Sequence, residues 1–193
     1  MRIFKNFLLF LFVSVLLLVG FFLFKYVSWE KKFLQEEIRC YSNIDVDLEI
    51  EEKIEKFIVS DSRTESIVFT QEEVLSILKS NIEVGDLFVL KDICIKPSKG
   101  MWSVYLSYGN NTLKLPWIRQ DVVKDDRETA ELYVREMFLG SINITRYLRR
   151  SALVDINKGI ADAIILVNEN RFLGREIRNI ELLEDRVVVK GVR

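Results

Sequence analysis

The sequence predicts an α+β protein: an N-terminal single transmembrane helix and stalk, then an antiparallel sheet packed against a long helix. Three observations predict this class. An uncharged apolar run fills residues 7–24, apolar and polar residues alternate in short stretches over residues 87–139, and apolar residues recur at threes and fours over residues 139–170. Only two prolines and eight glycines occur in 193 residues, so we expect a chain that is folded almost throughout.

The change of composition along the chain predicts three parts. Residues 1–29 form the N-terminal cytoplasmic tail and transmembrane anchor, residues 30–60 a helical stalk, and residues 61–193 the α+β domain.

The apolar run FLLFLFVSVLLLVGFFLF, from Phe7 to Phe24, has the length of a membrane span. As a helix it covers about 27 Å, close to the roughly 30 Å of a bilayer's hydrocarbon core. Lys25 closes the run, and Tyr26 and Trp29 follow at the depth that amphipathic aromatic side chains prefer. The alternative is a cleaved signal peptide, but its apolar region is shorter and ends in small residues, which FKYVSWEKK lacks. We therefore predict an uncleaved signal-anchor with Lys25, Tyr26 and Trp29 at the membrane interface.

The orientation of the span is less clearly encoded. Arg2 and Lys5 precede it without an acidic residue, which favours a cytoplasmic N-terminus, whereas Lys25, Lys31, Lys32 and Arg39 follow it. Long domains translocate largely regardless of such charges. We expect a single-pass protein of the cell membrane with its domain on the extracytoplasmic side, and the opposite orientation stays open.

Local patterns predict the elements that follow the span. SWEKKFLQEEIRCYS continues as a helical stalk, IEEKIEKFI forms a second short helix, and ESIVF forms a strand. Thr70 and Glu73 stand at the capping-box spacing and predict the start of a helix whose buried face holds Val74, Leu75 and Leu78.

The middle of the chain predicts an antiparallel meander. LFVLKDICIK and MWSVYLSY flank PSKG, which reads as a hairpin turn with Gly100 in a conformation that other residues avoid. In TAELYVREMFL, alternation places Ala130, Leu132, Val134 and Phe138 on one face. A long helix follows over residues 139–170, with a break near Ser151, and two strands joined at Glu184–Asp185 end the chain.

The titratable residues give little support for catalysis. The chain has no histidine, which removes the commonest general base, and adjacent acidic pairs such as Glu72–Glu73 point apart on a helix. We expect no enzymatic activity, no catalytic residue, no cofactor and no metal site. A formal net charge of −1 without clustered bases over a long stretch also argues against nucleic acid as a partner.

Two cysteines, Cys40 and Cys94, allow two arrangements. They form one disulfide if the domain faces an oxidising compartment, or they remain two ordinary buried thiols, which we consider the commoner outcome.

Three arginines, Arg146, Arg149 and Arg150, lie close together near the start of the long helix. They are our candidate contact for lipid headgroups or an acidic partner. The alternative is a solvated helix face paired with nearby carboxylates such as Asp155.

The stretches MFLGSINITRYL and NIELLEDRVVVKG resemble those of the YpmS-like and LmeA-like bacterial membrane-anchored domains, which are related to tubular lipid-binding folds. The resemblance also covers the helix from Thr70 to Leu75, the turn Leu139–Gly140–Ser141–Ile142 and the final Gly191, and extends over most of residues 64–193. It implies a curved sheet wrapped on a long helix, with room for an acyl chain between them. It assigns no binding residue.

Together these features predict a non-enzymatic, single-pass membrane-anchored domain that binds a lipid-like apolar ligand or a protein partner of the bacterial envelope. Its partners would be the lipid bilayer and one of these two ligands. The alternative is a structural subunit of a larger membrane protein assembly, but the span carries only Ser14 and Gly20 as small residues, without the small-xxx-small spacing.

Overall fold

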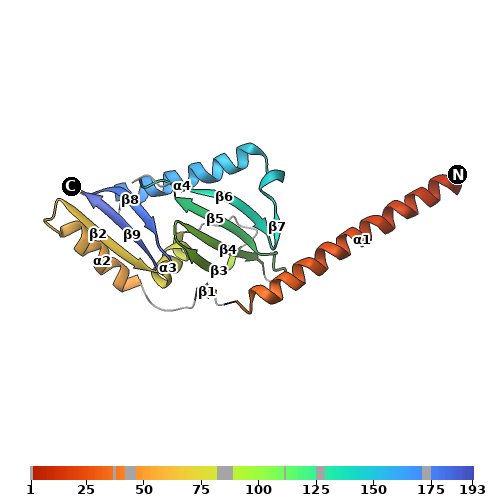
Figure 1. Ribbon diagram of the computed structural model, residues 1–193, viewed down its shortest axis with the longest axis horizontal. Helices are drawn as coiled ribbons and strands as arrows, with labels where there is room; N and C mark the ends of the chain where they lie inside the picture. The colour runs from red at the N-terminus through yellow and green to blue at the C-terminus, as the bar shows by residue number, and fades with distance from the viewer. Residues whose placement is uncertain are drawn as a thin grey trace. The chain divides into compact units, whose positions relative to one another are not determined.

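The computed structural model describes residues 2–36, 38–41, 47–81, 89–110, 112–124, 129–170 and 175–193. The chain divides into two compact units, Met1–Glu37 and Ile38–Arg193 (Figure 1). The described part of the second unit combines helices with antiparallel strands, which confirms the α+β class.

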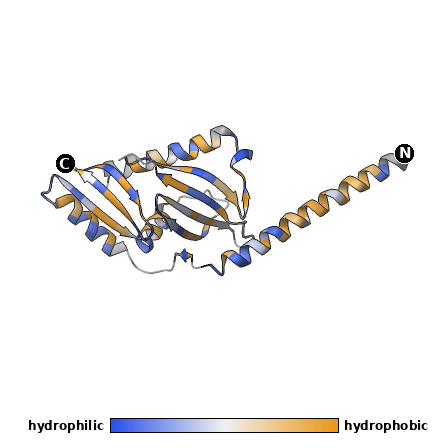
Figure 2. Ribbon diagram, in the orientation of Figure 1, coloured by the Kyte–Doolittle hydropathy of each residue, from blue (hydrophilic) through white to orange (hydrophobic). Residues whose placement is uncertain are grey.

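The first unit is dominated by one helix, α1 (Arg2–Phe33). Within the described residues, Lys5–Phe33 is one helical stretch long and apolar enough to cross a membrane, with a mean hydropathy of 3.0 in its most apolar window and none of that window buried. Figure 2 shows the hydrophobic colour along most of its length. Such a helix is compatible with a single-pass anchor or with a signal sequence.

The described residues of the second unit contain short strands and three further α-helices. In chain order these are β1 (Arg39–Cys40), α2 (Asp47–Val59), β2 (Thr64–Thr70), α3 (Gln71–Asn81), β3 (Val89–Ser98), β4 (Met101–Gly109), β5 (Ile118–Lys124), β6 (Leu132–Leu139), β7 (Ile142–Asn143), the 3₁₀ turn η1 (Thr145–Tyr147), α4 (Arg150–Asn170), β8 (Glu176–Leu182) and β9 (Arg186–Val192). Six strands form sheet A in the order β1-β3-β4-β5-β6-β7, and three form sheet B in the order β2-β9-β8. All the strand pairs are antiparallel.

One apolar core joins the two sheets and two of the helices. Ile50 and Phe57 from α2 and Leu75 from α3 are buried against strands of both sheets. The strand residues of this cluster are Ile67, Phe69, Leu90, Ile93, Ile95, Trp102, Val104, Leu106, Ile177, Ile180, Leu182, Val187 and Val189. The sheets meet at the turn of the β3–β4 hairpin, where the Gly100 N–H donates to the Leu182 carbonyl at 2.8 Å.

Two local predictions are confirmed at atomic detail. The Thr70 N–H donates to Glu73 Oε2 at 2.7 Å, and the Glu73 N–H donates to Thr70 Oγ1 at 3.3 Å, which is the reciprocal capping box at the start of α3. Gly100 has φ of +74° in the β3–β4 turn, a conformation that residues with a Cβ rarely adopt.

Residues 30–60, predicted as a helical stalk, divide instead between the two units. α1 ends at Phe33, residues 39–40 pair as a strand with β3, and α2 belongs to the unit Ile38–Arg193. The predicted short helix is present as α2, and its apolar face is buried in the core, which a sequence pattern without a known partner surface does not reveal. The long helix also begins later than predicted, at Arg150, because β7 and η1 occupy the residues before it.

A bulge changes the predicted face of β6. Asp121 pairs with Glu136 and the next residue, Val122, pairs with Val134, so the register shifts between them. Val134 therefore lies on the core side with Val122, whereas Phe138, predicted on the same face, pairs with Arg119 on the opposite face. There the Arg119 guanidinium carbon lies 3.6 Å from the centroid of the Phe138 ring.

Side chains cover the outer edge of β6. Asn157 of α4 accepts a hydrogen bond from the Val134 N–H at 2.8 Å and donates to the Val134 carbonyl at 3.4 Å. Thr145 Oγ1 accepts from the Met137 N–H at 2.7 Å and donates to the carbonyl of the same residue at 3.2 Å. These contacts satisfy backbone groups that would otherwise be open for pairing with another strand.

Candidate binding surfaces

The predicted membrane-interface residues lie along one part of α1. The Tyr26 and Trp29 rings are 5.8 Å apart, and Trp29 stacks on Phe33 at 5.0 Å between centroids. The Tyr26 hydroxyl also donates to Glu30 Oε1 at 3.4 Å. Lys25 Nζ lies 5.4 Å from the centroid of the Phe21 ring. The structure therefore groups these residues where the apolar run gives way to charged residues.

Two of the three predicted arginines lie at an exposed corner after sheet A. Arg146 is in η1 and Arg149 lies between η1 and α4, and both are exposed. Arg150 is the first residue of α4, and its side chain lies outside the described part of the structure. Between them, Tyr147 is 76 % exposed. We name Arg146, Tyr147 and Arg149 the basic corner.

The alternative arrangement for these arginines was pairing with carboxylates such as Asp155. Asp155 is exposed on α4, and none of the ion pairs found among the described residues includes it, Arg146 or Arg149. Within the described residues, the basic corner is thus a surface of positive charge beside an exposed aromatic ring.

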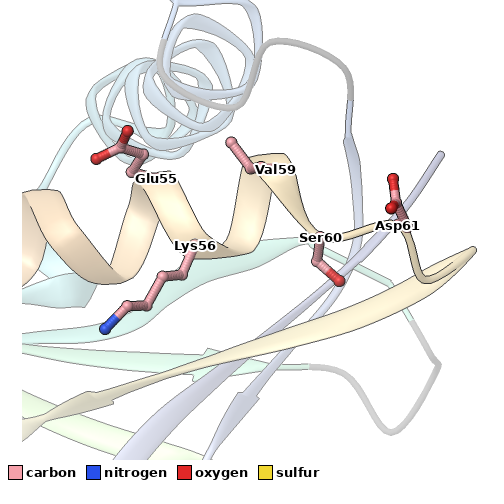
Figure 3. Close-up of a pocket in the computed structure, with 5 residues that line it drawn as sticks. All are labelled: Glu55, Lys56, Val59, Ser60 and Asp61. Atoms are coloured by element: carbon pink, nitrogen blue, oxygen red, sulfur yellow. The ribbon is translucent and has the colours of Figure 1, made fainter.

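A second surface is a groove along α2. Two adjoining depressions, of about 430 and 450 Å³, share Glu55 and Val59 in their walls. Their described lining residues, which we name the α2 groove, are Glu51, Ile54, Glu55, Lys56, Ile58, Val59, Ser60 and Asp61. Figure 3 shows Glu55 and Val59 pointing to one side of α2 and Lys56 to the other. Sequence analysis did not identify this groove, because its walls form only after α2 packs on the core.

The α2 groove has an apolar floor and an acidic rim. Ile54 and Ile58 are half-buried against the core, whereas Val59 is 65 % exposed. Among the rim carboxylates, Asp61 lies 3.4 Å from an Arg193 guanidinium nitrogen. Glu51 and Glu55 take part in no ion pair among the described residues, so the described wall of the groove carries uncompensated negative charge.

A buried arginine fixes the C-terminal end of α2 beside this groove. Arg175 is 2 % exposed and donates to the carbonyls of Phe57, Ser60 and Ser62, the last at 2.9 Å. The Phe57 carbonyl lies in the last turn of α2, where a helix end leaves carbonyls without intrahelical partners, and Ser60 and Ser62 lie in the segment that follows the helix. Gly191 allows the close packing here, because a Cβ at this position would lie 2.6 Å from Phe57 Cζ.

The start of β2 also holds a perturbed carboxylate, Glu65. Hydrogen bonds from the Ser60 hydroxyl, at 2.6 Å, and from the Ser66 N–H, at 3.2 Å, lower the pKa of Glu65 below its usual value of 4.5. Glu65 therefore stays ionised and ties β2 to the end of α2.

Cys40 and Cys94 form a disulfide, so the expectation of two buried thiols is wrong. The two residues face each other in the β1–β3 pairing, with their Cα atoms 3.9 Å apart. They are 54 residues apart in the sequence, and their pairing follows from a two-residue strand that no periodicity predicts.

The face of sheet A opposite the apolar core contains a buried polar cluster that the sequence analysis did not identify. Asp121 is 4 % exposed, accepts a hydrogen bond from Ser103 Oγ at 2.7 Å and lies 3.2 Å from Arg119 Nε. The arginine balances the carboxylate charge, and burial raises the pKa of the neighbouring Tyr105. Among the described residues, no group of three or more His, Cys, Asp or Glu could hold a metal ion.

Comparison of the chain with protein-family models, with curated proteins and with solved structures finds no match. The resemblance to the YpmS-like and LmeA-like domains therefore stays a prediction.

Proposed function

We propose that this protein is a non-enzymatic, single-pass membrane-anchored domain, with the unit Ile38–Arg193 on the extracytoplasmic side, whose α2 groove binds an apolar, positively flanked segment of another envelope protein. The observation that carries the proposal is the groove itself: an apolar floor, with Val59 65 % exposed, below carboxylates that lack a cation partner among the described residues. Surfaces that combine exposed apolar area with a polar rim are typical of interaction sites.

The anchor is supported by the composition and exposure of α1. None of its most apolar window is buried, and Lys25, Tyr26 and Trp29 follow at the end of the apolar run. The Cys40–Cys94 disulfide supports the extracytoplasmic side, because such bonds persist in oxidising compartments.

The charge of the α2 groove favours a protein segment over an anionic lipid. The uncompensated carboxylates Glu51 and Glu55 would repel a phosphate headgroup, whereas lysine or arginine beside an apolar segment would complement them. A lipid-like apolar ligand is the alternative that the same apolar floor would accept. The absence of histidine from the sequence supports a binding role over a catalytic one.

We also propose that α4 acts as the long helix that covers the sheets. Ile164 contacts the core cluster, and Asn157 bonds to β6. None of the α4 side chains that the structure describes is fully buried.

The binding proposal can be tested with the full chain in detergent micelles. The probes are a synthetic leucine-rich helical peptide flanked by lysines and the same peptide flanked by glutamates, with binding followed by fluorescence anisotropy. We expect the lysine-flanked peptide to bind at least about tenfold more tightly, since two unpaired carboxylates face it. Val59→Asn should weaken this binding. The matched control Val68→Asn, at an exposed valine on β2, should leave it unchanged.

Equal binding of the two peptides, or equal effects of the two valine variants, would contradict a role for the α2 groove. Native mass spectrometry of the purified chain separates the lipid alternative, because a co-purifying lipid would identify the ligand as lipid-like. Extraction of the full chain from vesicles by alkaline carbonate would contradict the anchor.

A further inference from the structure

Sheet B has an edge whose backbone groups are open. β2 is an outer strand of sheet B and pairs with β9 along all of Thr64–Thr70 without a register shift (Figure 1). The Arg193 N–H donates to the Arg63 carbonyl at 3.1 Å, so the odd-numbered residues of β2 bond to β9. In an antiparallel pair, the alternate residues point their N–H and carbonyl groups away from the partner strand. The backbone groups of Ser66 and Val68 therefore face outward.

The described residues leave this edge uncovered. The residues whose backbone groups face outward are all exposed: Thr64, Ser66, Val68 and Thr70. Helix α2 covers the inner face of the sheet instead, because Phe57 would touch a Cβ on Gly191 of the central strand β9. Apart from the ladder to β9, none of the hydrogen bonds found among the described residues involves Val68. The Ser66 N–H donates only to the carboxylate of its neighbour Glu65, at 3.2 Å.

Other strand edges in the described part of the two sheets are closed. β3 pairs with β1 and contains Pro97, which has no N–H to offer another strand. The Ile180 N–H of β8 donates to the Thr129 carbonyl at 3.3 Å. Side chains of Asn157 and Thr145 bind the edge of β6. Proteins commonly protect edge strands with such caps, with prolines, with bulges or with lysines, and β2 has none of these.

An antiparallel pairing with β2 of a second copy fits this open edge. When Ile67 lies opposite Ile67 of the second copy, the whole of β2 overlaps, and the open backbone groups of Ser66 meet those of Val68. On the exposed face, Thr64 then lies opposite Thr70, and paired threonines stabilise neighbouring strands. The same register therefore satisfies the backbone and matches the side chains.

The charge of β2 suits pairing with an identical strand. None of the residues whose backbone faces outward is charged. Glu65, the only charged residue of β2, lies opposite Phe69 in this register. Like charges therefore do not oppose each other across the pair, although the two strands are identical. A charged residue in the outward set would instead repel its own copy.

We propose that two copies of this protein associate through β2 and form one continuous sheet, with three strands from each copy, about a twofold axis beside Ile67. A single pair of seven-residue strands falls below the roughly 1,000 Å² of stable interfaces. The association is therefore weak and reversible, in keeping with an apolar core that is formed within one copy. This inference goes beyond the proposed function and depends on neither the α2 groove nor the anchor.

Engineered cysteines test the pairing and its register in the full chain in detergent micelles. Ser66→Cys and Val68→Cys are purified separately, mixed and oxidised. The two positions lie opposite each other between copies, so their Cα atoms would be about 5.5 Å apart, within the range for a disulfide. Two copies of either position would be about 7–8 Å apart, which is too far. We expect at least about tenfold more disulfide-linked dimer in the mixture than in either variant alone.

Hydrogen–deuterium exchange provides a second measurement on the natural chain. A peptide covering residues 64–70 should exchange several-fold more slowly as the protein concentration is raised, because the Val68 N–H becomes hydrogen-bonded only in the dimer. A peptide covering residues 176–182, at the other edge of sheet B, should exchange equally at all concentrations.

A lysine on the edge should weaken the association. Val68→Lys should lower the fraction of dimer by at least about threefold, because the twofold axis brings two like charges close together. The matched control is Val89→Lys, which adds the same charge at a valine of β3 that is 52 % exposed. It should leave the fraction of dimer unchanged.

Three results would overturn the inference. The first is a mixture of cysteine variants that forms no more linked dimer than either variant alone, and the second is an equal effect of the two lysine variants. The third is slow exchange of residues 64–70 that does not change with protein concentration, since another segment of the same chain would then cover the edge. Each of these results leaves the α2 groove and the anchor untouched, so failure of this inference is distinguishable from failure of the proposed function.

Discussion

Removal of the Cys40–Cys94 disulfide should strongly destabilise the unit Ile38–Arg193. The cleanest perturbation is Cys40→Ser, because the Cys40 side chain is exposed and the change loses little packing. Cys94, which is 1 % exposed, then remains as a buried thiol, an environment that cysteine tolerates well. The variant therefore isolates the effect of the covalent link.

The size of the effect follows from the length of the loop that the bond closes. For a sequence separation of 54 residues, the loss of loop entropy in the unfolded chain corresponds to about 4 kcal/mol at room temperature. β1 pairs only two residues with β3, so few native contacts add to this value. Typical domains have free energies of unfolding of about 5–15 kcal/mol, and the bond thus supplies a large part of the stability.

Guanidinium chloride unfolding of the full chain in detergent micelles measures this effect. Trp102 and Trp117, each 3 % exposed, provide the fluorescence signal. A loss of about 4 kcal/mol should move the midpoint down by about 1 M. A reductant should have the same effect on the natural chain and none on the Cys40→Ser variant. A natural chain whose midpoint is insensitive to reductant, or a loss below about 1 kcal/mol, would refute the reasoning.

Three further predictions use the same unfolding assay or a titration. Gly191→Ala should destabilise the protein by about 1–3 kcal/mol, because the new Cβ would meet Phe57. Gly159→Ala places its Cβ where no atom lies within 4 Å and should stabilise the protein by about 0.5–1 kcal/mol. Similar shifts for both variants would contradict the packing argument. Glu73→Ala should cost about 2 kcal/mol, since it removes a buried helix-capping carboxylate, and an unchanged midpoint would show that the cap is dispensable. Glu65 has a lowered pKa, so its contribution to the free energy of unfolding is present above pH 4.5 and is lost as the pH falls through the lower folded-state pKa. An NMR titration that gives a pKa of 4.5 or more for Glu65 would contradict this.

Local rules account for the parts of the fold that the sequence predicts well. The capping box at Thr70 and Glu73, the turn at Gly100 and the terminal strands joined at Glu184–Asp185 depend on residues a few positions apart. In such cases the side chain itself determines the backbone conformation, so the pattern is sufficient.

The features that the sequence does not predict depend on distant partners. The bulge in β6 is set by pairing with β5, and it turns Phe138 to the face opposite Val134. The disulfide depends on the two-residue strand β1, and the α2 groove depends on the packing of α2 against both sheets. Arg175 is one arginine among many in the sequence, and only the folded chain brings it to the end of α2.

The basic corner combines a feature that the local sequence predicts with one that depends on distant partners. The proximity of Arg146 and Arg149 was visible in the sequence, but the exposure of Tyr147 between them depends on η1, which forms because Thr145 binds the edge of β6. Periodicity predicts that this stretch belongs to the long helix, whereas the structure places Tyr147 in η1.

The position of the disulfide also determines how the protein carries mechanical load. If a load acts on sheet A while α1 stays in the membrane, tension enters at Cys40 and passes directly through the sulfur atoms into β3. The closed loop between the two cysteines contains α2, β2 and α3 and lies outside this force path. The α2 groove would therefore keep its shape under load. Sheet A would carry the force that is applied between it and α1.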